Sequence, residues 1–419
     1  MIAEPPKLLV LSSLFPSPAQ PGAGVFVRER MFRVAKHLPL VVLAPQAWFP
    51  FQGLIRRFRP HFRPPAPSFE VMDGIEVHRP RFLCFPGVWK RTDGMFMAIG
   101  CFLTARRVVR RHRLNLLDVH FGYPDGYAGI LLKRWLRIPM VLTLRGKEER
   151  QARMDVGGVL RKAVLGADRL VTVSDALRQV ALQFGADDRK ITVIGNGVDL
   201  DKFRSIPRLT ARSQFGLPTN ARILVSVGTL VERKGFHRVL DCMPALRERH
   251  PDLHLLIVGG AGPEGDIGPR LRAQTQSLGL GGCVHFLGAF PPDQLHVPLS
   301  AADVFVLATS YEGWANVFLE AMSCGLPVVT TRVGGNSEVV CDPSVGTVVE
   351  FGDAEALIEA IDAAVVRAWD HEAIIRYAQS NGWERRIRVL VHVLQDALAE
   401  APEGAKPVPV TGRSGGFND

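Results

Sequence analysis

Long apolar runs and paired cysteines are both scarce in this sequence of 419 residues. No stretch approaches the roughly 18–20 consecutive apolar residues that a membrane-spanning helix needs, so an integral membrane protein is not expected. The six cysteines form no C-x-x-C pair and no zinc spacing, which argues against a disulfide framework and a structural zinc site. The composition therefore favours a globular protein of a reducing compartment, the cytoplasm.

The first residues have little of the basic character that a signal peptide requires. Lys7 precedes an apolar run at 8–15, but Glu4 lies in the region that should be basic. A buried first strand explains the same run, and we expect that strand rather than a cleaved leader.

Acidic residues are outnumbered, with 51 Lys and Arg against 41 Asp and Glu, a net charge of +10 and a pI near 9.6. This excess indicates anionic partners. Arg and aromatic residues gather at 56–63 and 106–113, where a nucleic acid, an anionic membrane surface or no partner at all are the alternatives. We favour a membrane surface or an anionic acceptor and expect no nucleic acid, because Trp48, Phe49 and Phe51 flank the first cluster as interfacial anchors on acidic lipid would. The expected location is the inner face of the cell membrane.

Short β-branched apolar runs alternate with helical patterns in both halves of the chain. Such continuous apolar strands predict the α/β class, with two doubly wound parallel sheets covered on both faces. The polar, turn-rich stretch near 200–215 marks a boundary. We predict an N-terminal domain at 1–205, a second domain at 206–380, a helix at 381–400 that returns to the first domain, and a disordered tail at 401–419. Ligands of such sheets bind outside the carboxyl ends of the strands, so we expect a site in the cleft between the domains.

Two carboxylates, Glu312 and Glu320, stand with seven residues between them at the joint of a predicted strand and helix. Asn316 is the expected cap of that helix, and the start of a helix suits a phosphate. Carboxylates repel phosphate, so their natural targets are hydroxyl groups, such as those of a ribose or a sugar. A nucleotide sugar carries all these groups. The alternative is an idle pair of surface charges.

The stretch EGWANVFLEAMSCGLPVV, which contains both carboxylates, resembles the Glu-x7-Glu motif of glycosyltransferase family 4. The resemblance covers nearly all of residues 7–395 and implies the GT-B fold. It also implies a retaining transferase that takes a nucleotide-sugar donor, uses no metal and has no other cofactor. In that family the residue matching Glu320 binds the ribose and the residue matching Glu312 contacts the donor sugar.

The stretch VGTLVERKG resembles the family segment that binds the donor diphosphate, and the resemblance assigns Lys234 to that role. A family Arg is replaced by Thr229, so Arg233 is the expected substitute. The stretch VHFLGAF resembles the segment that frames the base, with Leu287 as the nearest contact. The remaining donor contacts are expected from the helix start at Asn316, Val317 and Phe318.

Segments of the first half resemble the same family. The loop with Gly22 and Gly24, which is not the G-x-G-x-x-G fingerprint, would approach the diphosphate. His120 matches a histidine near the reacting sugar, where a structural histidine is the alternative. Arg145 stands in place of another family histidine and is expected to hold a phosphate or an acidic acceptor. Ser174 and Asn196 would line the cleft entrance on the acceptor side.

The acceptor is expected to be a glycan or a polyprenyl-linked glycan, because residues 48–95 resemble transferases of surface-polysaccharide synthesis, teichuronic-acid-type enzymes among them. Two other functions stay open, a nucleotide-sugar epimerase of the same fold and a catalytically silent binding module. The D-x-D sequence of Asp199 and Asp201 resembles a metal clamp of another transferase fold, but it lies in the predicted linker. We see no general base with a partner, and the oligomeric state cannot be derived.

Overall fold

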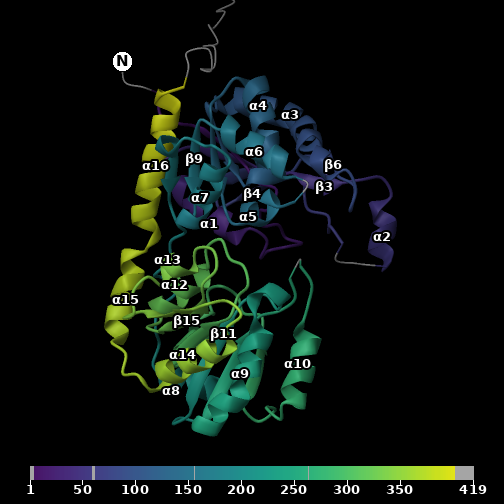
Figure 1. Cartoon of the computed structure of the whole chain (residues 1–419). Coiled ribbons are helices and arrows are strands. Elements are labelled where there is room, and N and C mark those ends of the chain that lie inside the picture. The colour runs from purple at the N-terminus through teal and green to yellow at the C-terminus, as the bar shows by residue number, and fades with distance from the viewer. Residues whose placement is uncertain (1–3, 59–61, 155, 263, 402–419) are drawn as a thin grey trace, which may run out of the picture. The chain divides into compact units, whose positions relative to one another are not determined.

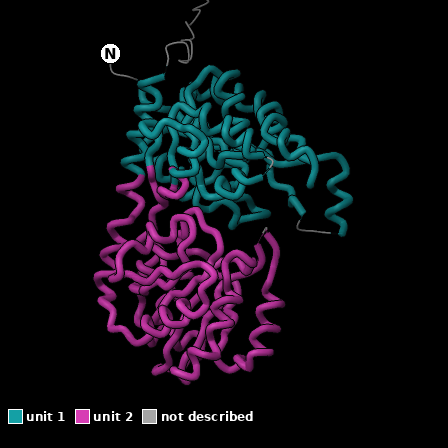
Figure 2. The backbone as a smooth tube through the Cα atoms, in the orientation of Figure 1, with its two compact units in different colours: residues 1–172, 179–192, 387–419 teal, residues 173–178, 193–386 magenta. Residues whose placement is uncertain are grey.

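The computed structural model describes residues 4–58, 62–154, 156–262 and 264–401. The predicted tail, apart from residue 401, lies outside these residues. The chain divides into two compact units (Figure 2). Unit 1 comprises 1–172, 179–192 and 387–419, and unit 2 comprises 173–178 and 193–386.

An eight-stranded sheet in the order β10-β9-β8-β7-β1-β2-β5-β4 forms the centre of unit 1. Only the β4–β5 pair is antiparallel among the pairings that the register defines. Every residue of β1 and β8 is buried, as expected of strands covered on both faces. The strands are β1 (Leu8–Leu11), β2 (Leu40–Leu43), β4 (Phe69–Met72), β5 (Ile75–His78), β7 (Leu116–His120), β8 (Met140–Leu144), β9 (Arg169–Thr172) and β10 (Ile191–Val193).

Helices flank this sheet, and two of them carry the chain between the units. These two are α7 (Asp175–Gln183) and α16 (Trp383–Ala399), within which the unit assignment changes. The others are α1 (Val25–Val34), α3 (Asp93–His112), α4 (Tyr127–Leu136), α5 (Lys147–Ala152) and α6 (Gly157–Gly166), with short turns η1 (Lys90–Thr92), η2 (Gly122–Gly126) and η3 (Asp188–Lys190).

The segment that interrupts the βα rhythm has structure of its own. β3 (Gln46–Trp48) pairs in parallel with β6 (Arg81–Leu83), and α2 (Gln52–Phe58) lies at the margin of unit 1 (Figure 1). Of the three expected anchors only Phe51 is exposed, at 87%, whereas Trp48 and Phe49 are half-buried. Phe49 packs against Phe62 and Phe85 instead, so the prediction of one exposed basic and aromatic surface was only partly right.

Unit 2 contains a six-stranded parallel sheet in the order β13-β12-β11-β14-β15-β16. Its apolar strands and covering helices share one core. The strands are β11 (Arg222–Val227), β12 (Leu253–Val258), β13 (Val284–Gly288), β14 (Val304–Leu307), β15 (Val328–Thr331) and β16 (Gly346–Val349). The helices are α8 (Arg208–Gln214), α9 (Phe236–Arg249), α10 (Gly268–Ser277), α11 (His296–Ala301), α12 (Asn316–Ser323), α13 (Asn336–Val339), α14 (Ala354–Val366) and α15 (His371–Ser380), with the turn η4 (Glu232–Lys234).

The strand orders define one switch point in each sheet, where consecutive connections run to opposite sides. In unit 1 it lies between β1 and β7, and in unit 2 between β11 and β14. Loops diverge at such a point and leave a crevice at the carboxyl ends of the strands. Functional side chains are therefore expected in the loops after these four strands.

Candidate functional site

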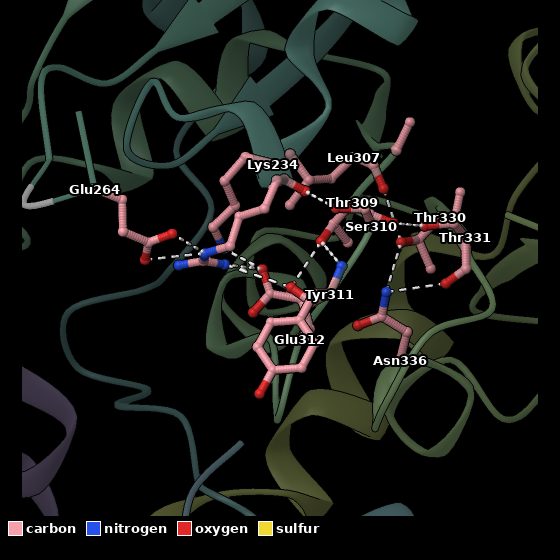
Figure 3. Close-up of polar contacts among 12 residues, drawn as sticks. Lys234, Glu264, Leu307, Thr309, Ser310, Tyr311, Glu312, Thr330, Thr331 and Asn336 are labelled. Carbon is pink, nitrogen blue, oxygen red and sulfur yellow. Dashed lines mark hydrogen bonds and ion pairs between the residues drawn. The ribbon is translucent and has the colours of Figure 1, made fainter. Parts of the chain in front are cut away.

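The switch point of unit 2 brings together Lys234 and Arg233, which follow β11, and Glu312, which follows β14 (Figure 3). Lys234 Nζ and Arg233 Nη1 both contact Glu312 Oε1, the latter at 3.1 Å. The Nε atom of Arg233 lies 3.0 Å from Glu264 Oε2 on its other side. Three residues predicted from two separate motifs thus form one cluster.

Backbone contacts that only glycine permits hold the two loops in this position. Gly235 has φ +75°, and a Cβ there would lie 1.8 Å from the carbonyl oxygen of Ala308. Ser310 N also donates to Arg233 O at 2.8 Å. Gly334 has φ +48°, and its Cβ would lie 1.7 Å from the carbonyl oxygen of Glu312. The glycines let three loops pack edge to edge around the carboxylate.

The cluster combines two cations with the carboxylates of Glu312 and Glu264. Glu312 is only 8% exposed, and it shares its carboxylate between two cations. Burial alone would lower the pKa of Arg233, but the carboxylates of Glu312 and Glu264 outweigh it and raise that pKa. Arg233 therefore stays charged, and an anionic ligand can compete with Glu312 for Arg233 and Lys234.

The helix start at α12 differs from the prediction in one respect. Its N-cap is Ala315, without a side-chain hydrogen bond, and Asn316 is the first helical residue. Asn316 is not the cap because its Oδ1 accepts from Asn196 Nδ2 at 3.0 Å. Phe318 is fully buried against Phe305, so its side chain does not contact a ligand.

The other predicted residues of unit 2 lie on separate elements. Glu320 is half-buried on α12, Val317 is half-buried near its start, and Leu287 is half-buried on β13. Ser174 and Asn196 are buried, at 0% and 4% exposed. These positions leave their predicted roles as predictions.

The switch point of unit 1 holds His120 and Arg145, which the structure brings into direct contact. Arg145 Nη2 lies 3.0 Å from Nδ1 of His120, and Asp118 Oδ2 lies 3.4 Å from its Nε2. The His120 ring is fully buried, which lowers its pKa to about 4, with Asp118 opposing and Arg145 adding to the shift. The imidazole is therefore neutral and accepts from Arg145. A ring enclosed in this way favours positioning of Arg145 over direct proton transfer.

Two buried acids that sequence reasoning missed organise the same loops. Glu148 accepts from the backbone N–H groups of Gly122, Arg145 and Gly146 at 2.8, 3.1 and 2.7 Å. Asp125 accepts from Ser13 Oγ at 2.8 Å, a bond across the switch from the β7 loop to the β1 loop. Burial raises the pKa of Asp125 to about 6, against the hydrogen bonds from Ser13. The sequence signal that could have identified both residues is an acidic side chain a few positions after a predicted strand.

The two glycines of the loop after β1 differ in their constraints. Gly24 has φ +67° before α1, and a Cβ there would lie 2.1 Å from Leu14 O. A Cβ at Gly22 would meet nothing within 4 Å. Gly24 is required by the fold, whereas Gly22 is not.

The D-x-D pair of unit 2 forms a local turn. Asp199 Oδ1 accepts from the backbone N–H groups of Asp201 and Lys202 at 3.1 and 3.2 Å. In the part of the chain that the structure describes, no group of three or more His, Cys, Asp or Glu side chains has the arrangement of a metal site.

Within the described residues, no helix combines the length and the apolar character needed to cross a membrane.

Comparison with protein families matches most of the chain in two parts. Residues 207–381 match the family model described as glycosyl transferases group 1, and residues 52–202 match that of glycosyltransferase family 4.

Individual relatives extend over nearly the whole length. The chain is similar to a putative teichuronic acid biosynthesis glycosyltransferase of Bacillus subtilis, with 28% identity over 96% of each chain. It is 34% identical to a D-inositol 3-phosphate glycosyltransferase of Geodermatophilus obscurus over 82% of this chain and 81% of the relative. Among solved structures, HepE of Anabaena in complex with UDP has a TM-score of 0.68 at 20% identity, covering 93% of this chain and 100% of that one. That likeness supports the fold.

Proposed function

Because the chain belongs to the group 1, family 4 glycosyltransferases and has their GT-B fold, we propose that it moves a sugar from a nucleotide-sugar donor to a hydroxyl group of a glycan acceptor. The proposal includes retention of the anomeric configuration, independence of metal ions and a place in surface-polysaccharide synthesis.

The observation that carries this proposal is the pair of cations at the switch point of unit 2. Lys234 and Arg233 are held side by side on one carboxylate, in the crevice where a parallel sheet binds its ligands. Two adjacent cations match the two phosphates of a donor diphosphate. Arg233 thereby supplies the contact that Thr229 cannot.

The remaining parts of the donor, namely the ribose, the base and the sugar, have proposed contacts as well. Glu320 would accept hydrogen bonds from the ribose, Leu287 would lie against the base, and the first N–H groups of α12 would face a phosphate. Glu312 would turn from its cations to the hydroxyl groups of the donor sugar. Gly22 and Gly24 of unit 1 would approach the diphosphate.

The chemistry requires charge stabilisation on the leaving diphosphate. Lys234, Arg233 and the start of α12 are preorganised donors for that charge, and they need no reorganisation in the transition state. The departing phosphate oxygen can take the proton of the acceptor hydroxyl, so no separate general base is assigned. His120 would act by holding Arg145, which would bind an acidic acceptor.

A donor screen tests the proposal. The full chain is incubated with a panel of nucleotide sugars and a membrane extract, and nucleoside diphosphate release is measured with Glu312→Ala and Lys234→Ala as controls. We expect release from one donor class, loss in both variants and no effect of a chelator. No turnover of any donor would overturn the transferase proposal, and NMR of the product tests retention.

The same assay without acceptor separates the two alternatives. An epimerase converts the sugar of the donor and releases no nucleoside diphosphate, whereas a silent module binds the donor and converts nothing. Departures from the family pattern at Thr229 and Arg145 motivate the second alternative.

We also propose that unit 1 binds an anionic membrane surface. Phe51, just before α2, and Leu54 and Phe58 on α2 are 87%, 60% and 81% exposed, and Arg57 is exposed on the same helix. On α3, Ile99 and Leu103 are 56% and 73% exposed, two turns and one turn before the exposed Arg106 and Arg107. Exposed apolar side chains beside basic ones suit interfacial binding to acidic lipid.

Vesicle flotation tests this surface. We expect binding to vesicles with anionic lipid and a loss of at least about five-fold in the Phe51→Ser/Phe58→Ser variant, because each removes apolar area from the interface. Leu209→Ser on α8, where Leu209 is 60% exposed, is the matched control in unit 2. Binding that is indifferent to lipid charge would contradict the proposal.

A further inference from the structure

A cavity of about 200 Å³ lies in unit 1, outside the clusters described so far. Its lining includes four arginines, Arg56, Arg63, Arg79 and Arg81, and no acidic residue. Three segments supply its wall, namely the loop after β1, the loop after β2 and the segment from β3 to β6. The cavity is therefore strongly basic.

The cavity lies at the edge of the sheet where ligands are expected. Ser13 and Ala44, which line it, follow the carboxyl ends of β1 and β2. Ser13 is also the residue whose hydroxyl bonds to Asp125 in the loop after β7. The cavity thus adjoins the switch point of unit 1.

Several buried polar atoms in the wall of this cavity have no hydrogen-bond partner among the described residues. Arg79 is only 3% exposed; its Nη2 donates to Pro16 O at 2.8 Å and contacts Glu70, but its Nη1 has no partner among the described residues. Arg56 Nε and the Oε1 of Gln52 are also buried without a described partner. Buried polar groups are normally satisfied, and an unpaired guanidinium N–H indicates a missing acceptor.

The positive charge of the wall is also largely uncompensated. Glu70 pairs with Arg79, whereas Arg56, Arg63 and Arg81 have no carboxylate partner in the described part of the chain. Arg63 donates to the carbonyl of Cys84 at 2.8 Å and lies over the ring of Phe49. Its guanidinium is thereby fixed in orientation before any ligand arrives.

We propose that this cavity binds a phosphoryl group of the acceptor, a phosphate or diphosphate ester. The inference rests on the proposed function and names the acceptor class. Several guanidinium groups around one small space suit a tetrahedral anion with many acceptor oxygens. Whole small-molecule pockets take roughly 300–1,000 Å³, so this smaller cavity fits the charged end of a ligand.

Calorimetry with pyrophosphate tests the site directly. The background is the full chain with Lys234→Met and Arg233→Met, which removes the cations of unit 2 as a competing anion site. In this background we expect pyrophosphate to bind, and Arg56→Gln or Arg81→Gln to weaken it roughly ten-fold, because each removes a charge-assisted contact. Arg57→Gln is the matched control, since Arg57 is exposed on the same helix and does not line the cavity.

The result of the pyrophosphate experiment can be distinguished from a failure of the proposed transferase function. Absence of pyrophosphate binding, or equal effects of Arg56→Gln and Arg57→Gln, overturns the cavity proposal even if the wild-type chain releases nucleoside diphosphate. Binding that depends on Arg56 supports it even if no donor is turned over.

Competition identifies the source of the phosphoryl group. The two competitors are a soluble sugar phosphate and neutral-lipid vesicles that carry a polyprenyl diphosphate. Displacement of pyrophosphate by the first assigns a soluble phosphate ester, and displacement by the second assigns a lipid-linked acceptor. If neither displaces it, the proposed acceptor role is wrong.

Discussion

The Nη1 atom of Arg233 lies 3.1 Å from Oε1 of Glu312, the same oxygen that Lys234 contacts. The carboxylate therefore occupies the cations that are proposed to bind the donor diphosphate. Under that proposal, binding of the donor would exchange these ion pairs for contacts with phosphate, and the exchange would free Glu312 for the sugar.

Glu312→Gln separates binding from turnover. The neutral amide holds the two cations less firmly, so we expect nucleoside diphosphate to bind about five- to ten-fold more tightly. Turnover should fall at least about 100-fold, because the sugar loses a charged contact that acts in the transition state. Calorimetry and initial rates measure the two effects.

Glu264→Gln is the matched control for this variant. Its carboxylate contacts Arg233 but its side chain is 53% exposed, so smaller changes in both quantities are expected. Weaker nucleotide binding in Glu312→Gln would refute the exchange.

Lys234→Met and Arg233→Met test whether both cations hold the diphosphate. Each loss removes a hydrogen bond to a charged group, about 1.5–3 kcal/mol, and should weaken nucleoside diphosphate binding roughly 10- to 100-fold. Arg376→Met on α15, where the side chain is 62% exposed, should leave binding unchanged. An effect confined to Lys234 would show that Arg233 does not replace the missing family residue.

Most strands of the two large sheets could be read from the sequence because each is a continuous apolar run between turn residues. β3, β4, β5, β6 and β16 were missed, since runs such as that of β4 mix polar and apolar residues and leave alternate positions exposed. Glu312 and Lys234 were found because local motifs mark them.

Asp125 was missed because its partner Ser13 is distant in the sequence, and Glu148 because the backbone N–H of Gly122, which its carboxylate also binds, lies 26 positions away. The Ser13–Asp125 bond joins residues 112 positions apart, and nothing local in the sequence indicates it. Asn316 was misread for the same reason, since its partner Asn196 lies 120 positions away. Long-range polar contacts of this kind depend on strand order, which local patterns do not specify.

Alanine at Gly334 tests the packing of loops around Glu312. The added Cβ would lie 1.7 Å from a backbone oxygen that cannot move alone, so a loss of more than about 3 kcal/mol of unfolding free energy is expected. Gly216→Ala shares the positive φ but has nothing within 4 Å of the new Cβ, and should cost only about 1 kcal/mol. Urea unfolding of both variants gives the comparison, and equal losses would mean that backbone strain alone explains the effect.

Two buried groups of unit 1, His120 and Asp125, contribute with opposite signs to the pH dependence of the unfolding free energy. The pKa of His120 is lowered from 6.5 to about 4 in the folded chain, so the unfolded chain binds more protons between these values. Stability from His120 is therefore lost as the pH falls through that window. The pKa of Asp125 is raised from 3.8 to about 6, so the folded chain binds more protons there and stability is gained as the pH falls.

Asp125→Asn exposes this compensation, because the amide oxygen can still accept from the Ser13 backbone N–H, the amide nitrogen can donate to the Ser13 hydroxyl oxygen instead of accepting from it, and the amide cannot titrate. Between pH 7 and pH 5 the variant should lose on the order of 1–2 kcal/mol more unfolding free energy than the wild type, at about 1.4 kcal/mol per pKa unit. His120→Gln should show the reverse, a smaller acid loss than the wild type. Urea midpoints at the two pH values measure the slopes, and identical slopes in all three proteins would mean that neither group titrates as its burial requires.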